Sequence, residues 1–329
     1  MPVSPHSDQI EQIEQIELSQ TVAPEHTGLR LDQAAAQLFP DFSRARLQEW
    51  IKLGQLTLNG EVGRAKDKVL EGDQLVLMAE MEAATDFRPE PMQLDIVHED
   101  DDVIVVNRPV GLVVHPAAGN YTGTLLNGLL AHCPALQALP RAGIVHRLDK
   151  DTSGLMVVAK NLTAHQDLVA QLQARTVSRH YHAVVIGVAT AGGTIDAPIG
   201  RHPVQRQRRA VTDAADARPA VTHYRVLNRF RSHSHLLVQL ETGRTHQIRV
   251  HMAHIGMPIV GDQVYGGRLK PPRGAAPALL DFLQQFKRQA LHAGVLGFHH
   301  PADGEYMEWQ AELPADMQEL LRLLELDRG

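Results

Sequence analysis

The hydrophobic positions near the start of the chain first follow a helical spacing and then alternate as in strands. Residues 29–38 place Leu and Ala on one face. Phe39 and Pro40 end this predicted helix, because the residue before a proline disfavours the helical conformation. A second helix is predicted over 44–52, with Ser43 as its N-cap. The strands predicted to complete this small domain cover 55–60 and 73–77.

Two segments beside this domain lack such periodicity. Residues 1–22 are polar and acidic, and their few Ile side chains form a stripe too narrow to pack, so we expect a disordered acidic tail. Residues 81–92 contain prolines and acids without a hydrophobic period, which predicts a linker. The small domain is therefore placed at 27–80 and a second domain at 93–329.

The second domain has many predicted strands and few long helices. The strands cover 94–97, 103–106, 155–160, 179–186, 236–240 and 289–298. The helices cover the Leu-rich segment after Thr124, residues 163–173, residues 246–254 with Thr245 as N-cap, and the segment after Pro314. Strands and helices do not alternate regularly, so we expect an α+β fold with a mixed, mostly antiparallel sheet. Residues 191–235 are turn-rich and basic, which suits either a flexible loop or an arm that contacts phosphates.

Composition limits the class of protein. Apolar residues make up 43% of the chain, enough for a large core. The single cysteine, Cys133, excludes a disulfide framework and cysteine-based zinc fingers, and it fits a reducing compartment. The chain shows no signal peptide and no run of about 18 apolar residues, so we expect a cytoplasmic protein without a membrane span.

Charge is unevenly distributed along the chain. The net charge is -6, yet residues 141–249 carry 16 Lys and Arg against 7 Asp and Glu. A protein that binds phosphates needs a basic face rather than a basic total. This segment therefore favours a nucleic-acid partner, with a solvated basic surface as the alternative.

The candidate chemistry centres on one polar stretch between apolar segments, residues 143–155. Within it lie His146, Arg147, Asp149, Lys150 and Asp151. The alternative is an ordinary polar turn between two strands.

Several familiar sites are missing from the sequence. It has no Gly-x-Gly-x-x-Gly after a strand and no phosphate loop, so no nucleotide cofactor is indicated. His251 and His254 would share a helix face, but no matching acid or His-Glu-x-x-His pattern accompanies them. We therefore expect neither a metal nor a cofactor.

The small domain resembles the S4 RNA-binding domain. The matching positions are Arg30-Leu31-Asp32, Phe39, Ser43-Arg44, Ile51, Gly54 and Asn59-Gly60. In that family the second helix and the following turn lie on RNA, so the resemblance implies RNA contacts for Arg44, Arg46 and Lys52. A small helical adaptor with solvated cations is the alternative.

The second domain resembles the RluA-type RNA pseudouridine synthases. The segment 146–155, His-Arg-Leu-Asp-Lys-Asp-Thr-Ser-Gly-Leu, matches the family's signature. Residues 179–181 match its second motif and 240–249 its third, while Asn107, Pro109 and His115-Pro116 fit its opening. Arg108 departs from the Lys of many relatives but keeps the cation.

This resemblance implies a pseudouridine synthase fold and a cofactor-independent isomerisation of uridine to pseudouridine in 23S ribosomal RNA. It also implies a monomer. A non-catalytic RNA-binding or ribosome-assembly factor, and a carboxylate glycosidase for small sugars, are the competing functions.

Residue roles follow from the same resemblance. Breaking a glycosidic bond calls for a carboxylate near the sugar, as nucleophile or as base, and Asp149 is the candidate. Asp151 is its rival, although Thr152 beside it suggests a turn-capping role. Arg249 is implied as the cation that keeps Asp149 ionised, and Tyr181 as the ring that packs on the target base.

The remaining implied contacts surround the flipped nucleotide. Arg147 would fill the space that the uridine leaves, unless it forms an ion pair with Asp151. His146 and Lys150 would grip phosphates. The other residues expected to contact the substrate or RNA are Arg244, His246 and Leu291, the last with a core leucine as its alternative.

Overall fold

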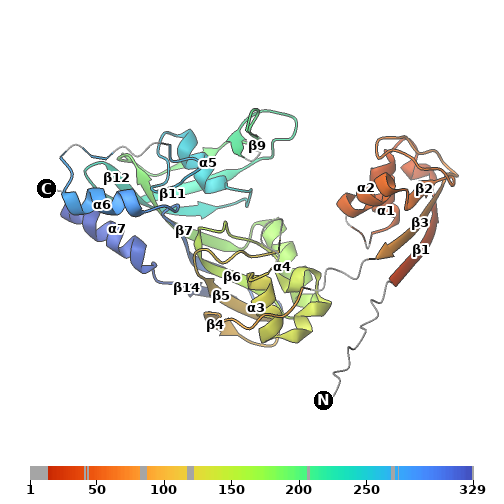
Figure 1. The fold of residues 1–329 in the computed structure, drawn as a ribbon, viewed down its shortest axis with the longest axis horizontal. Helices are drawn as coiled ribbons and strands as arrows, with labels where there is room; N and C mark the ends of the chain where they lie inside the picture. Colours follow the sequence, from red (N-terminus) through yellow and green to blue (C-terminus); the bar gives the residue numbers. More distant parts are fainter. Residues whose placement is uncertain are drawn as a thin grey trace, which may run out of the picture. The chain divides into compact units, whose positions relative to one another are not determined.

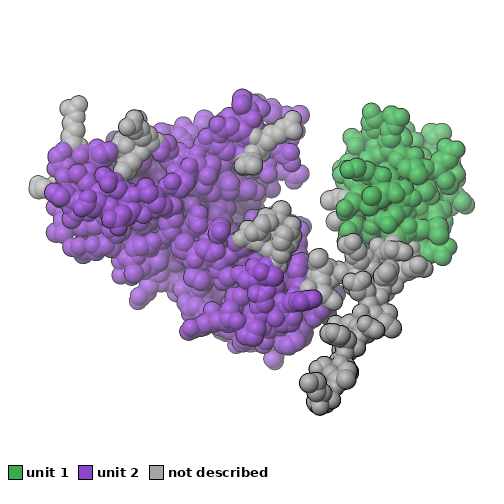
Figure 2. All heavy atoms as spheres, viewed as in Figure 1, with its two compact units in different colours: residues 1–86 green, residues 87–329 purple. Residues whose placement is uncertain are grey.

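The structure of the chain is a computed structural model that describes residues 14–40, 42, 44–81, 87–116, 122–205, 208–267, 271–272 and 274–327. The chain divides into two compact units, Met1–Asp86 (unit 1) and Phe87–Gly329 (unit 2), which Figure 2 shows in different colours. Each unit has its own hydrophobic core.

Unit 1 packs two helices against a three-stranded sheet of order β1-β3-β2 (Figure 1). Its elements are β1 (Glu14–Thr21), η1 (Pro24–His26), α1 (Leu31–Leu38), α2 (Arg44–Leu53), β2 (Leu56–Leu58) and β3 (Gln74–Met81). The predicted helices form because their apolar faces meet in one core, which Leu31, Leu47, Trp50 and Leu75 fill. The predicted N-cap Ser43 lies outside the described residues.

The predicted disordered tail is wrong for residues 14–21, which form β1. This strand pairs antiparallel with β3 along its whole length, from Glu14 opposite Met81 to Thr21 opposite Gln74. The side chains of residues 17–21 are exposed. Backbone hydrogen bonds hold this edge strand, so its hydrophobic pattern gives no signal. Residues 1–13 lie outside the described part of the chain.

Unit 2 is built on a nine-stranded sheet of order β4-β5-β6-β13-β7-β12-β11-β8, with β14 paired to β13. Its strands are β4 (Ile96–Glu99), β5 (Val103–Arg108), β6 (Ser153–Ala159), β7 (Ser178–Ile186), β8 (Gly193–Asp196), β11 (Val221–Arg229), β12 (His233–Leu240), β13 (Leu291–His299) and β14 (Tyr306–Gln310). Among the described residues only β6 and β13 pair in parallel. The prediction of a mixed, mostly antiparallel sheet is confirmed.

Helices cover both faces of this sheet. They are α3 (Leu125–His132), α4 (Leu162–Ala174), α5 (Gln247–His254), α6 (Pro277–Gln285) and α7 (Ala315–Leu326), with short turns η2 (Pro134–Ala138) and η3 (Pro140–Gly143). Alternate residues of β5 face opposite sides, so Ile104 joins the core that contains α3 while Val105 joins the core that contains α4. β6 is buried along its whole length because both faces are covered.

The basic segment 191–235 is more ordered than its turn-rich sequence predicts. It contains β8, β11 and the start of β12, together with a separate hairpin of β9 (Ile199–Arg201) and β10 (Arg209–Val211). Figure 1 shows this hairpin beside α5. α6 and β14 were likewise not predicted from the sequence.

The predicted linker 81–92 also differs in its second half. Residues 82–86 lie outside the described residues, but residues 87–92 bind α3. The Glu90 amide donates to the Asn127 carbonyl at 3.0 Å, and the Asn127 side chain donates to the Arg88 carbonyl at 2.9 Å. This segment therefore belongs to unit 2.

The parallel contact between β6 and β13 requires a glycine. Gly154 has φ +120°, and a Cβ there would lie 2.2 Å from the Ala293 carbonyl oxygen. The loop before β6 is thereby held against β13. Within the described residues, no helix has the length and apolarity needed to cross a membrane.

Candidate active site

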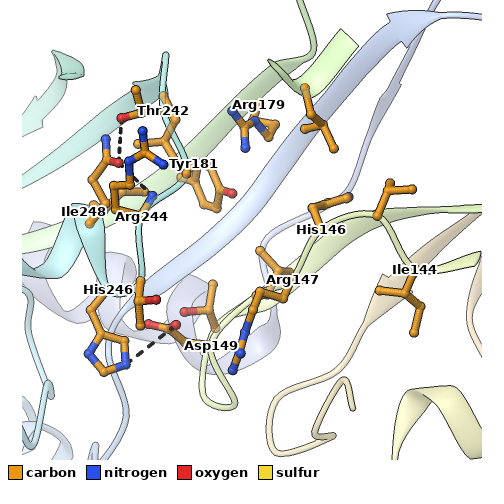
Figure 3. Close-up of a pocket in the computed structure, with 18 of the residues that line it drawn as sticks. Ile144, His146, Arg147, Asp149, Arg179, Tyr181, Thr242, Arg244, His246 and Ile248 are labelled. Atoms are coloured by element: carbon orange, nitrogen blue, oxygen red, sulfur yellow. Dashed lines mark hydrogen bonds and ion pairs between the residues drawn. The ribbon is translucent and has the colours of Figure 1, made fainter. Parts of the chain in front are cut away.

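A cavity of about 980 Å³ opens in unit 2 where the loop before β6 faces β7, β13 and the start of α5. Figure 3 shows the polar side chains that converge on it. The lining residues that matter for its chemistry are these polar ones and one leucine, namely His115, Arg141, His146, Arg147, Asp149, Arg179, Tyr181, Arg244, His246, Arg249 and Leu291. The His-Pro pair at 115–116, which fits the opening motif of the family that the sequence resembles, also lines this cavity.

The loop that carries Asp149 is fixed by one buried guanidinium. Arg108, at the end of β5, is 1% exposed. It donates to the carbonyls of Asp149 at 2.7 Å and Lys150 at 3.2 Å, and also to those of Leu112 and Thr152. Burial lowers the pKa of Arg108 to about 10, so the group remains charged at neutral pH. The loop backbone thus wraps around a cation.

The Asp149 carboxylate is held by an arginine that a second carboxylate supports. Arg249, on α5, donates to Asp149 Oδ2 at 2.9 Å. The same guanidinium binds Asp262 through Nε at 2.7 Å and through its second terminal nitrogen at 3.0 Å. Asp262 is fully buried at its side chain, whereas Asp149 remains 21% exposed toward the cavity.

The electrostatics of this network favour its charged form. Burial alone would lower the pKa of Arg249, but the hydrogen bonds and charges of Asp262 and Asp149 raise it above its usual value. Burial would raise the pKa of Asp262, and the Arg249 bond together with two backbone amides lowers it instead. The Arg249 cation therefore stands permanently beside Asp149.

His246 approaches the other oxygen of the same carboxylate. Its Nε2 lies 3.9 Å from Asp149 Oδ1, as Figure 3 shows, and its Nδ1 lies 2.9 Å from the Tyr265 hydroxyl. Burial lowers the pKa of His246, and the positive charges of Arg249 and Arg147 add to this effect against the opposing carboxylates. His246 is also the N-cap of α5, with φ 58°, so the prediction of Thr245 as N-cap is wrong. The Gln247 side chain accepts the Arg244 amide there.

An apolar wall faces the carboxylate. Tyr181 on β7 and Leu291 on β13 are both buried and both line the cavity. Burial raises the pKa of Tyr181, so its hydroxyl keeps its proton. A charged carboxylate opposite a flat ring and a leucine suits chemistry on a sugar whose planar base is held by stacking.

Comparisons with known proteins also indicate an enzyme that acts on the bases of RNA. A family model described as RNA pseudouridylate synthase matches residues 102–254, and an S4 domain model matches residues 29–75. The ribosomal large subunit pseudouridine synthase D of Pseudomonas aeruginosa is 62% identical over 92% of this chain and 93% of its own length. The protein of the same name from Escherichia coli K12 is 53% identical over 95% and 96%. The solved structure of human RNA pseudouridylate synthase domain containing 4 is 26% identical, with a TM-score of 0.55 over 70% of this chain and 92% of that chain.

The chain belongs to the RNA pseudouridylate synthase family. The resemblance drawn from its motifs is confirmed, as is the fold expected from them, a synthase domain with an N-terminal S4 domain. Pseudouridylate synthases are isomerases that act on RNA.

In this pseudouridylate synthase the expected site residues fall into three groups. The structure brings most of them to the cavity, namely His146, Arg147, Asp149, Tyr181, Arg244, His246, Arg249 and Leu291. Lys150 is exposed and does not line the cavity. Arg44, Arg46 and Lys52 lie on α2 of unit 1.

Two residues of the signature have surroundings that the sequence did not suggest. The His146 Nε2 accepts the Val157 amide at 3.1 Å, and burial together with the Arg179 charge lowers its pKa to about 3. A neutral imidazole with one nitrogen occupied can offer a phosphate only its other N–H. Arg147 is exposed, and no ion pair with Asp151 or any other residue that the structure describes involves it.

The cationic side chains of the S4 domain differ in their contacts with buried acids. Arg44 donates to the buried Asp32 carboxylate at 2.6 Å, alongside Arg30 and Gln48. These bonds lower the pKa of Asp32 against the effect of its burial. Arg44 therefore stabilises the domain as well as presenting charge, whereas Lys52 is exposed.

Two functional positions escaped the sequence analysis. Asp262 lies in the glycine-rich turn 261–267, to which the sequence analysis assigned no site residue, although the single acid of this turn was an available signal. Arg108 was noted only as a departure from the family's Lys. Among the described residues, one group of three could coordinate a metal, Asp100, Asp102 and His300. None of these three residues lines the cavity.

Proposed function

We propose that this synthase converts specific uridines of 23S ribosomal RNA to pseudouridine, acting as a monomer in the cytoplasm without metal or cofactor. The observation that carries the proposal is the Asp149 carboxylate, held by Arg249 at the edge of a cavity that Tyr181 and Leu291 line. The names of the bacterial relatives support the choice of large-subunit RNA.

The reaction exchanges one glycosidic bond for another. The bond between N1 of uracil and C1′ of ribose breaks, the base turns, and C5 bonds to C1′. The proton on C5 leaves and N1 gains one, so the product is an isomer of the substrate. Asp149 serves this reaction either as the nucleophile at C1′ or as the base that removes a ribose proton.

The other cavity residues hold the nucleotide in place. A stacked uridine cannot reach Asp149, so the base must leave the helix at a cost of about a few kcal/mol. Arg147, whose guanidinium is exposed at the cavity, fills the vacated position. Tyr181 and Leu291 hold the detached uracil while it turns, and Arg244 and His246 contact the RNA beside it.

The S4 domain supplies affinity rather than chemistry. We propose that residues 27–80, joined to the synthase domain through the segment around residue 85, bind RNA through Arg44, Arg46 and Lys52. A non-catalytic RNA-binding factor would need no buried Asp262 to support Arg249 beside an open carboxylate.

The experiment is a map of pseudouridines in 23S ribosomal RNA from a strain that lacks the gene. We expect a small set of pseudouridines to disappear and to return when the gene is supplied on a plasmid. An unchanged map in the deletion strain contradicts the proposal.

A further inference from the structure

Tyr265 occupies a position behind the wall of the active-site cavity. It is half-buried in the turn after α5, and it is not one of the residues that line the cavity. Its amide donates to Asp262 Oδ1 at 3.0 Å. The residue is therefore anchored to the carboxylate that supports Arg249, yet it does not reach the substrate.

The ring of Tyr265 lies close to two arginines from different elements. The guanidinium carbon of Arg249, on α5, lies 5.1 Å from the ring centroid. That of Arg208, in the β9–β10 hairpin, lies at the same distance of 5.1 Å. Cations at this distance from an aromatic ring are attracted to it. Arg208 also donates to the Val264 carbonyl, which fastens the hairpin to this turn.

The hydroxyl of Tyr265 joins the hairpin to His246. The Arg209 amide, in β10, donates to the hydroxyl oxygen at 3.0 Å. The hydroxyl oxygen lies 2.9 Å from His246 Nδ1. Burial raises the pKa of Tyr265, so the phenol keeps its proton. A hydroxyl that accepts from an amide has its own proton free to donate to the imidazole.

This donation selects one tautomer of His246. Burial lowers the pKa of His246, so the ring is neutral at neutral pH. A neutral imidazole that accepts at Nδ1 carries its proton on Nε2. Nε2 is the atom that faces Asp149 Oδ1 at 3.9 Å.

We propose that Tyr265 is a positioning residue: its hydroxyl orients His246 so that the Nε2 proton faces Asp149, and it does so only while the β9–β10 hairpin is docked. The inference rests on the proposed function of Asp149. It assigns to the hairpin a second task beyond presenting positive charge.

A second pocket gives RNA a direct way to act on this hairpin. It has a volume of about 260 Å³, and Arg209, Arg218 and Arg244 line it together with Asp216. A phosphate of the bound RNA held between these arginines would bind Arg209 and so hold β10 in place. β10 is the strand whose amide at Arg209 donates to the Tyr265 hydroxyl. Docking of the RNA backbone and orientation of His246 are thereby linked through one tyrosine.

The test is Tyr265→Phe in the full chain, with Tyr224→Phe as the matched control. The Phe variant keeps the ring that contacts the two arginines and loses only the hydroxyl. Nitrogen-15 NMR of the histidine ring nitrogens, measured without RNA, should show His246 protonated on Nε2 in the wild type. In the Phe variant it should show a mixture of the Nε2-protonated and Nδ1-protonated tautomers. In single-turnover assays, the rate at saturating RNA should fall about tenfold, as for loss of the outer partner of a functional histidine, and the RNA concentration that gives half of the maximal rate should change little. The control should leave both readouts unchanged, because Tyr224 lies on β11 and, within the described residues, its hydroxyl forms no hydrogen bond with His246 or Arg209, unlike that of Tyr265.

Arg208→Ala provides an independent variant that leaves Tyr265 intact. It should move the tautomer and the rate in the same direction, because the hairpin loses its stacking contact and its bond to Val264. An unchanged His246 tautomer or an unchanged rate in Tyr265→Phe overturns the inference, and no effect from Arg208→Ala overturns the role of the hairpin. The tautomer readout needs no substrate, so it remains decisive even if the wild-type chain forms no pseudouridine and the proposed function fails.

Discussion

Arg249 binds a carboxylate on each side, and only one of them faces the substrate. The outer partner, Asp149, is 21% exposed, whereas the inner partner, Asp262, is completely buried. The inner pair thus holds the cation in place without any contact from the substrate.

Removing the inner carboxylate should lower the stability of the fold. In Asp262→Asn, the buried Arg249 loses a charged partner, and breaking a buried ion pair costs about 3 kcal/mol or more. Urea unfolding at pH 7 should show this loss, with Glu319→Gln, an exposed i,i+3 pair with Arg322, as the control without effect. The pKa of Asp262 is lowered on folding, so its contribution is present above its unfolded pKa and is lost as the pH falls through the lower folded value. Equal unfolding free energies for both variants contradict this reading.

Removing the guanidinium of Arg108 should destabilise the loop that carries Asp149. Arg108→Met leaves the carbonyls of Leu112 and Thr152 without their buried donor. Buried acceptors without partners cost about 1–3 kcal/mol each, so the unfolding free energy should drop by at least about 2 kcal/mol. Arg108→Lys keeps the cation with fewer donors and should lose less. If the two variants are equally stable, the guanidinium does not hold the loop as described.

The turn between β4 and β5 depends on one carboxylate. Asp100 accepts the amides of Asp102 and Val103, both at 2.8 Å, and binds His98 and His300. Burial would raise the pKa of Asp100, but these hydrogen bonds lower it to about 2. A pKa lowered on folding gives stability that is complete above the unfolded value near 4 and disappears as the pH falls toward 2.

Asp100→Asn should therefore be less stable than the wild type above pH 4, and the two should converge toward pH 2. Unfolding free energies measured at several pH values between 2 and 6 check this. A difference that stays constant across that range would show that the charge of Asp100 does not stabilise the turn.

Elements with a buried apolar face were predictable from the sequence, and elements held mainly by backbone pairing were not. β5, β6 and the helices of unit 1 follow their hydrophobic spacing because that spacing matches a buried face. Residues 17–21 of β1 and the last part of β11, at 225 and 227–229, expose their side chains, so their sequences look like loops. β12 begins with three buried polar residues, His233, Ser234 and His235. A hydropathy pattern does not show that such polar residues are buried.

The site residues also divide into those that the sequence identifies and those that it does not. Asp149, Tyr181 and Arg249 were reached through motifs, since nothing in their spacing shows that residues 149 and 249 meet. Asp262 and Tyr265 could not be assigned roles, because their importance depends on which side chains surround the turn rather than on the turn itself. His146 was expected to contact phosphate, but its bond to Val157 depends on the register of β6 against the loop.

At the scale of the whole molecule, affinity and chemistry should be separable. Lys52 is exposed on α2 of the S4 domain, and Lys52→Gln should weaken RNA binding and reduce the salt slope of log K by about one. The rate at saturating RNA should not change, because Lys52 lies outside unit 2 and its cavity. Lys287→Gln, an exposed cation of unit 2 outside the cavity, serves as the control. A lower rate at saturating RNA in Lys52→Gln would contradict a role limited to binding.

The central claim is that Asp149 performs the isomerisation. Its most direct test is the release of the C5 hydrogen from labelled uridine in 23S ribosomal RNA of the deletion strain, measured for the wild type and for Asp149→Asn. The Asn side chain keeps the size of the carboxylate and can still accept from Arg249, so the fold and the RNA affinity should be retained. We predict that the wild type releases the label and that Asp149→Asn binds the RNA but releases none. Release of the label by Asp149→Asn at the wild-type rate would contradict this role of Asp149.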